Sequence, residues 1–242
     1  MLTLHKSLDY KDNAMINLNN LNNLLFGVYP YVAVIVFLVA SWIRFDREQY
    51  TWKADSSQLL NGKNFRLASN LFHIGVIFVL SGHLVGLLTP ESIYHHFISS
   101  PNKQLLAMIS GGFFGFICLI GLVMLINRRL TDARVRANSK KSDIMILFLL
   151  LIQLLLGLTT IFISTSHLDG SVMILLADWA QNIVTFHGIQ AADSIESVNI
   201  IYKLHIFVGL TMVLIFPFTR LVHIISVPVW YLGRCYQVVR ER

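Results

Sequence analysis

Four histidines lie inside long apolar stretches of the chain, where an ionisable side chain is costly. His73 and His83 share one stretch, and His205 and His223 share another. Ionisable residues inside a membrane are rare, and they usually face a cofactor, a transport pathway or one another. Two histidines on each of two helices are the minimum set that can hold two six-coordinate haems, with one histidine on each side of each iron. The first hypothesis is therefore a pair of haem sites.

The apolar stretches belong to a chain whose composition suits a lipid bilayer. Of its 242 residues, 55% are hydrophobic and 13% are charged, whereas soluble domains average about 25% charged residues. Five stretches reach the length of about 20 residues that a membrane-spanning helix needs. They are Leu24–Ile43, Leu67–Leu88, Leu105–Ile126, Ile144–Ile163 and Ile200–Val222. The predicted fold class is an all-α membrane protein with five transmembrane helices.

Positive charge is distributed unevenly between the connections, and this predicts the orientation. Lys and Arg are concentrated in the first and third connections and after the last span, whereas the second connection has only Lys103 and the fourth has none. Because Lys and Arg mark cytoplasmic loops, we predict an N-terminus outside and a cytoplasmic C-terminus. Topology then accounts for the net charge of +6, and no nucleic-acid partner is expected.

The sequence divides into a polar lead (1–23), a five-helix domain (24–227) and a short tail (228–242). The lead is rich in Asn and lacks the apolar segment and cleavage site of a signal peptide, and Met15 is an alternative start. Within the fourth connection, Ser171–Gly188 is too polar to span a membrane but is rich in apolar residues. This pattern predicts a helix lying on the outer surface of the membrane.

The predicted direction of each span pairs the histidines by depth. The second span runs from inside to outside and the fifth runs back, so His83 and His205 lie near the outer face. His73 and His223 lie near the inner face. The spacing on the fifth span is about five turns at about 3.6 residues per turn, which places both of its histidines on one face. The two separations differ, about 15 Å on the second span and about 27 Å on the fifth, and we expect tilt and a kink at Pro217 to absorb the difference.

Residues near the histidines fit the same hypothesis. Gly82, beside His83, leaves room either for a flat ring or for the close approach of another helix. Arg220, three residues before His223, and Arg129, at the end of the third span, are predicted to bind the propionates of the inner haem. The alternative is that these arginines mark the cytoplasmic border of the membrane. The histidines in polar segments are expected to be solvated: His5, His95, His96, His167 and His187.

Four segments of the sequence resemble a known family. They are YPYVAVIVFLVASWIRFDREQYTWKADSSQ, NLFHIG, GHLVGLLTP and FPFTRLVHIISVPVWYLGRCYQVVR. They resemble the gamma subunit of membrane-bound respiratory nitrate reductase, in loops as well as spans, from Tyr29 to Arg240. The resemblance implies a five-helix cytochrome b with two haems. Its axial ligands fall on His73, His83, His205 and His223.

The resemblance also implies a function. Such a subunit lies in the bacterial cytoplasmic (inner) membrane, oxidises quinol near the outer face and serves anaerobic respiration. It passes electrons through two haems to an iron–sulfur beta subunit and a molybdenum-containing alpha subunit, which reduce nitrate. Neither Cys118 nor Cys235 lies in a C-x-x-C-H motif, so the haems are of b type.

Two further roles concern the ends of the bundle. The resemblance places Lys103 at the quinol site, where Gly82 would leave space for the ring. The alternative is a lysine that snorkels to the membrane interface. The tail Val227–Arg242 alternates bulky apolar residues with arginines and is expected to dock the iron–sulfur subunit. Its alternative is an amphipathic segment lying on anionic lipid.

Three other functions are weighed against this one. A related di-haem anchor could serve another catalytic partner, such as a sulfur-compound reductase. A metal permease could bind zinc or copper through the histidines, but it would need carboxylates or methionines among the spans, and the spans hold almost no Asp or Glu. A passive membrane anchor would leave four intramembrane histidines unexplained.

Overall fold

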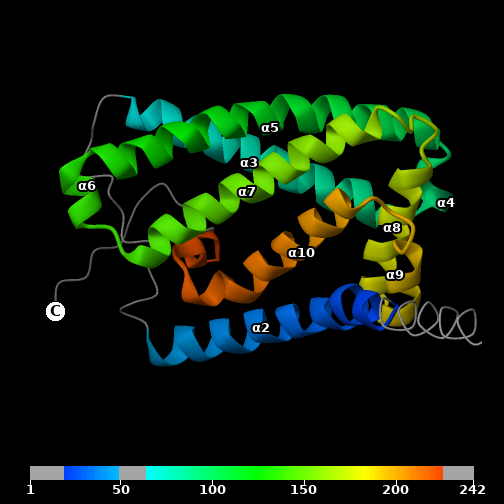
Figure 1. Ribbon diagram of the computed structural model, residues 1–242, viewed down its shortest axis with the longest axis horizontal. Helices are drawn as coiled ribbons and strands as arrows, with labels where there is room; N and C mark the ends of the chain where they lie inside the picture. Colours follow the sequence, from blue (N-terminus) through cyan, green and yellow to red (C-terminus); the bar gives the residue numbers. More distant parts are fainter. Residues whose placement is uncertain (1–18, 49–63, 226–242) are drawn as a thin grey trace, which may run out of the picture.

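The computed structural model describes residues 19–48 and 64–225 (Figure 1). Over these residues the chain is helical and contains no strand. Five helical segments are long and apolar enough to cross a membrane. The first is Asn19–Arg47, which contains η1 (Asn23–Val28) and α2 (Tyr29–Arg47). The next three are α3 (Phe65–Leu88), α5 (Ser100–Thr131) and α7 (Lys141–Ser164). The last is Ile200–Phe218, which contains α10 (Ile200–Ile215) and η3 (Phe216–Phe218). The prediction of an all-α protein with five membrane spans is confirmed.

The first four helical segments are longer than the predicted apolar stretches, because polar turns extend them at their ends. The third span, predicted at Leu105–Ile126, begins at Ser100 with Pro101 in its first turn, a position that proline favours. It continues to Thr131. Asp143 at the start of α7 accepts a hydrogen bond from the backbone N–H of Lys140 at 3.3 Å. Hydropathy detects the part of a helix that would lie in hydrocarbon, so these polar turns were not predicted.

Two glycines bring α3 and α5 into close contact. A Cβ added at Gly75 of α3 would lie 2.6 Å from the backbone nitrogen of Cys118. One added at Gly121 of α5 would overlap the backbone of Phe72. Small residues at such positions let membrane helices approach closely. These glycines therefore serve helix packing.

Short helices close one end of the bundle. Figure 1 shows α8 (Ser171–Val184) and α9 (Gly188–Ser194) crossing this end. Helix α4 (Glu91–Tyr94) lies near α8, and α9 packs against η1. We call this end of the bundle the α9 end. Trp179 on α8 donates to the Phe26 carbonyl at 3.0 Å, which ties α8 to η1. The predicted helix in the fourth connection is thus present and is too short to span a membrane. The opposite end, which carries α6 (Ala133–Ala137), is called the α6 end.

The last span is broken, which corrects the sequence-based description of one continuous helix over Ile200–Val222. Helix α10 stops at Ile215, because Pro217 has no N–H to donate. Thr219 is extended, with φ −118° and ψ 176°. The chain then forms a separate 3-10 turn, η4 (Arg220–Ile224), which carries His223. The inference that His205 and His223 share one face of a single helix was therefore wrong, and a break replaces the expected kink.

Candidate functional site

The four intramembrane histidines meet as two pairs, in the combinations predicted from depth. His83 on α3 faces His205 on α10, with 6.0 Å between the ring centroids, toward the α9 end. His73 on α3 faces His223 on η4, with 6.4 Å between the centroids, toward the α6 end. The break before η4 brings His223 to its partner, so the difference in spacing between the two elements does not prevent pairing.

The separation within each pair suits two ligands on opposite sides of one metal ion. An imidazole nitrogen binds a transition-metal ion at about 2.0–2.1 Å, and the centroid of the ring lies about 1 Å beyond that nitrogen. Two rings on opposite sides of one ion therefore have centroids about 6 Å apart. Residues 19–48 and 64–225 contain no group of three or more His, Cys, Asp or Glu that could hold a metal ion. A haem iron needs only two protein ligands, because its macrocycle supplies four nitrogens.

Three of the rings are anchored through Nδ1. A main-chain carbonyl can only accept, so each of these Nδ1 atoms carries the hydrogen and leaves the Nε2 lone pair for a metal. Such second partners orient metal-binding histidines and fix their tautomer. The bonds run from His73 to the Ser69 carbonyl (2.7 Å), from His83 to the Val79 carbonyl (2.8 Å) and from His223 to the Arg220 carbonyl (2.7 Å).

The helices that carry the pairs pack mainly against other helices. Helix α3 packs against α5 and α8, whereas α10 packs against α7 and α2. His73 and His83 are exposed. A Cβ added at Gly82 would meet nothing within 4 Å. The ring separations, the tautomers of His73, His83 and His223, and the exposure of His73 and His83 fit a haem at each pair.

Lys103 lies against the end of α3. Its ammonium is 3.4 Å from the Thr89 carbonyl, at the C-cap of α3, and 3.6 Å from the centroid of the Tyr94 ring. Only 8% of the residue is exposed. A lysine that snorkels extends its ammonium into water, and this one is covered instead. The structure therefore brings Lys103 to the helix end that carries His83, as the sequence predicts.

A short chain of hydrogen bonds begins at Tyr94, beside this lysine, at the α9 end. The Tyr94 hydroxyl is 3.0 Å from the Ser100 hydroxyl, which is 2.9 Å from Nε2 of His95. His95 also pairs with Glu91 at 3.1 Å, and both of these side chains are about half exposed. Burial raises the pKa of Asp178 on α8, and the nearby Glu91 carboxylate adds to the rise. The chain thus leads from Tyr94, whose ring face the Lys103 ammonium contacts, to His95 and Glu91 at the surface.

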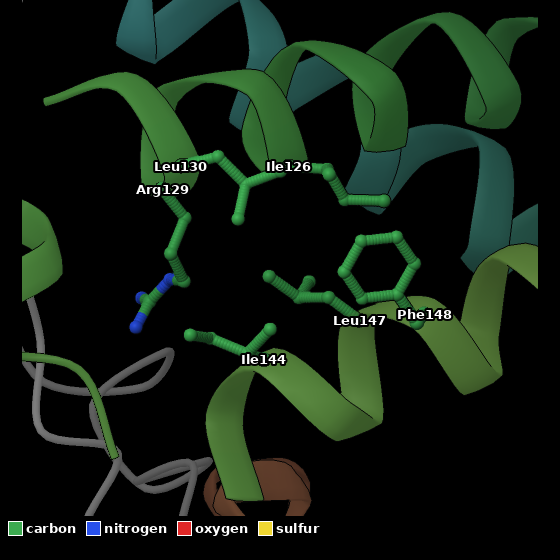
Figure 2. Close-up of a pocket in the computed structure, with 6 residues that line it drawn as sticks. All are labelled: Ile126, Arg129, Leu130, Ile144, Leu147 and Phe148. Atoms are coloured by element: carbon green, nitrogen blue, oxygen red, sulfur yellow. The ribbon is translucent and has the colours of Figure 1, made fainter. Parts of the chain in front are cut away.

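Arg129 is tied to a partner that sequence analysis missed. Its Nη1 donates to the Ser139 hydroxyl at 2.7 Å and to the Asp143 carboxylate at 3.3 Å, and both charged side chains are buried. Figure 2 shows its guanidinium pointing away from the apolar residues of a crevice between α5 and α7, which has no space for a water molecule. The lining residues are Ile126, Arg129, Leu130, Ile144, Leu147 and Phe148. The ion pair joins the start of α7 to the end of α5.

Arg220 begins the turn η4 that carries His223 of the His73–His223 pair. Its carbonyl holds the His223 ring. Among the described residues its side chain has no hydrogen bond or ion pair, although it lies near enough to Arg129 for their charges to interact. Within residues 19–48 and 64–225, Arg129 thus already has an anionic partner and Arg220 does not.

The remaining sequence predictions fall into two groups. Four histidines are exposed as predicted: His95, His96, His167 and His187. His5, most of the polar lead and the tail Val227–Arg242 lie outside the described residues, so the docking role of the tail stays a prediction.

Gln153 on α7 is a further polar residue of the site that sequence analysis missed. Its amide donates to the His205 carbonyl at 3.1 Å. The available signal was a lone glutamine within the apolar run LFLLLIQLLLG. A polar side chain inside a membrane span needs a partner, and that partner lies on another helix.

The fold and its histidine pairs define a class of protein, a helical membrane protein that carries two bis-histidine constellations between its spans. Comparison with known proteins gives the family. The chain belongs to the nitrate reductase gamma subunit family, because the sequence model of that family matches residues 22–242. The resemblance seen in the sequence is thereby confirmed.

Individual relatives match over nearly their whole length. The chain is 52% identical to the respiratory nitrate reductase 1 gamma chain of Escherichia coli (strain K12) over 222 residues, which are 92% of this chain and 98% of that one. It is 48% identical to the respiratory nitrate reductase 2 gamma chain of the same organism, with the same coverage. It is 37% identical to the nitrate reductase gamma chain of Bacillus subtilis (strain 168), over 90% of this chain and 98% of that one. These relatives are gamma chains of nitrate reductase, an oxidoreductase complex.

Proposed function

We propose that the chain is the quinol-oxidising, di-haem cytochrome b subunit of a respiratory nitrate reductase. The observation that carries the proposal is the pair of ring separations. They are 6.0 Å between His83 on α3 and His205 on α10, and 6.4 Å between His73 on α3 and His223 on η4, the turn after the last span. When bound, two b-type haems would supply one-electron transfer across the membrane. His83 and His205 would hold one and His73 and His223 the other, and neither iron would keep an open position for oxygen.

The charge pattern supports an orientation for this activity. Helix α2 ends and α3 begins at the α6 end, and α5 ends and α7 begins there as well (Figure 1). In the sequence, Arg44–Arg66 and Arg128–Lys141 hold 11 of the 19 Lys and Arg residues. By the positive-inside rule this end is cytoplasmic and the α9 end is outside. Protons released from quinol at the α9 end would stay outside while electrons move inward. Moving one charge across 100 mV takes about 2.3 kcal/mol, which the redox reaction must supply.

Lys103 and Gly82 form the proposed quinol site near the outer histidine pair. The ammonium of Lys103 donates a hydrogen bond to one quinol oxygen, and the open surface over Gly82 admits the ring. The chain from Tyr94 through Ser100 to His95 provides hydroxyl and imidazole groups between this buried position and the surface.

The remaining parts of the proposal concern partners and location. The chain resides in the bacterial cytoplasmic membrane, and its five-helix domain spans 24–227. Its cytoplasmic side meets an iron–sulfur beta subunit, which passes electrons to a molybdenum-containing alpha subunit. The tail 228–242 docks the beta subunit. The gamma-chain relatives support a nitrate reductase over a sulfur-compound reductase as the complex that is served.

A reduced-minus-oxidised optical spectrum of membranes containing the chain tests the proposal. We expect b-type bands from two haems per chain, and quinol should reduce both. The control is the same membrane without the chain. A preparation that carries bound zinc or copper and no haem would instead indicate the metal permease, and one that carries neither would indicate a passive anchor.

Substitution of the two arginines should separate a propionate partner from a structural one. Arg220→Leu should change the potential or the occupancy of the inner haem, because a cation near its propionates is lost, and the protein should still accumulate. Arg129→Leu should leave Asp143 buried without its partner, which costs about 3–5 kcal/mol. Redox titration and the amount of chain in the membrane measure these effects. An Arg220→Leu protein with an unchanged inner haem would remove the case for that residue.

A further inference from the structure

His205 is held differently from the other three histidines. Their Nδ1 atoms each contact a carbonyl of their own helix or turn, but Nδ1 of His205 is buried and has no hydrogen-bond partner within residues 19–48 and 64–225. Its polar neighbour comes from another helix. The amide nitrogen of Gln153 on α7 lies 3.1 Å from the His205 carbonyl oxygen and 3.5 Å from Nε2 of the ring.

Two glycines make room for this contact. At Gly157, one turn after Gln153 on α7, an added Cβ would lie 3.0 Å from Cε1 of His205. At Gly209, one turn after His205 on α10, it would lie 3.1 Å from the amide nitrogen of Gln153. Residues four apart on a helix lie on the same face. The amide and the ring are therefore enclosed where α7 and α10 meet.

Both side chains keep an unpaired polar atom in this enclosure. In the part of the chain that the structure describes, the amide oxygen of Gln153 is buried without a hydrogen-bond partner, as is Nδ1 of His205. An unsatisfied buried donor or acceptor costs about 1–3 kcal/mol, so such atoms rarely stay alone. When Nε2 of a neutral imidazole binds a metal, Nδ1 carries the hydrogen and is a donor, and an amide oxygen is an acceptor. The two unpaired atoms are complementary.

We propose that Gln153 is the positioning residue of His205. In the structure Nε2 of His205 is the ring nitrogen beside the amide; when the ring turns so that Nε2 faces the iron, the amide oxygen of Gln153 accepts the Nδ1–H hydrogen bond. The amide would then accept the Nδ1–H of His205, as main-chain carbonyls accept the Nδ1–H of His73, His83 and His223. The inference rests on the proposed haem ligation by His205. An acceptor at Nδ1 raises the basicity of the ligand, which stabilises the ferric state of the haem between His83 and His205.

Gln153→Met removes both polar atoms of the amide and keeps a side chain of similar length. We expect the ferric form of the outer haem to lose about tenfold in stability relative to the ferrous form, which raises its one-electron midpoint potential by about 59 mV. The low-spin ferric EPR signal of that haem should change, and the inner haem should keep its potential. Gln104→Met is the matched control, because Gln104 is also buried in a span but donates to the carbonyls of Ser164 and His167.

A second variant protects the test against a folding defect. Gly157→Ala places a methyl group 3.0 Å from the His205 ring without removing the glutamine, and it should change the same EPR signal. If both variants leave the outer haem unchanged while wild-type membranes hold two b-type haems, the role of Gln153 is refuted and the proposed function survives. Equal losses of both haems in Gln153→Met, or the same shift in Gln104→Met, would likewise refute it. Wild-type membranes without two b-type haems would instead refute the proposed function.

Discussion

A His83→Ala protein should lose the haem at the α9 end and keep at least part of the haem at the α6 end. The His83 and His205 rings face each other at 6.0 Å, so removing either ring leaves one axial position of that iron without its ligand. His205→Ala should give the same result. His73→Ala and His223→Ala should do the reverse, because those rings face each other at 6.4 Å. Each variant should retain about half of the haem if one site empties completely, since a bis-histidine haem depends on both ligands.

Haem content, the reduced-minus-oxidised spectrum and redox titration of membranes measure this result. The matched control is His187→Ala, because His187 is exposed at the α9 end and its Nδ1 contacts the Thr185 hydroxyl at 3.0 Å. This control should keep both haems. If His83→Ala and His223→Ala selectively removed the same haem, the pairing would be wrong.

The pairs could be predicted from sequence because depth in a membrane is a single coordinate. The positive-inside rule orients each span, and a rise of about 1.5 Å per residue then gives each histidine its depth. The order of the histidines along each span, outer before inner or the reverse, does not depend on the helix being continuous. His223 therefore meets His73 even though the last span breaks at Pro217, while the argument from a shared helix face failed at that break.

The partners of the site could not be predicted from sequence in the same way. Contacts such as Arg129 with Asp143, or Gln153 with His205, depend on how each helix is rotated about its axis and which neighbour it faces. Helices α3, α7 and α10 have apolar residues on all sides, because lipid and protein surroundings are equally apolar. Hydropathy therefore locates these helices but does not show which face meets which neighbour.

Glycines illustrate the same limit. Gly75 and Gly82 are seven residues apart on α3 and are indistinguishable in sequence. In the structure Gly75 lies against the backbone of Cys118, whereas a Cβ at Gly82 would meet nothing within 4 Å. Only their neighbours separate a packing glycine from one beside an open face. The prediction that Gly82 leaves room therefore depended on an arrangement of helices that the sequence does not contain.

Replacing Lys103 with alanine should slow quinol-dependent reduction of both haems by about 10- to 100-fold without loss of either haem. A hydrogen bond from a charged group is worth about 1.5–3 kcal/mol, and in the proposed site this ammonium donates to a quinol oxygen. The residue is 8% exposed and contacts Thr89 at the end of α3. Quinol analogues that inhibit the wild-type protein should also bind the variant more weakly.

Stopped-flow reduction of the haems by quinol, together with haem content, measures this effect. Lys203→Ala is the matched control, because Lys203 is a second lysine at the α9 end and its ammonium donates to the Glu196 carbonyl at 2.7 Å. This control should keep wild-type quinol kinetics. Dithionite needs no quinol site, so it should reduce both haems of the Lys103→Ala protein fully. Slow reduction by quinol but not by dithionite would show that the defect lies in quinol binding or oxidation and not in the haems. Unchanged quinol kinetics in a fully haem-loaded Lys103→Ala membrane would show that this lysine contributes only to the packing of α5 against the end of α3.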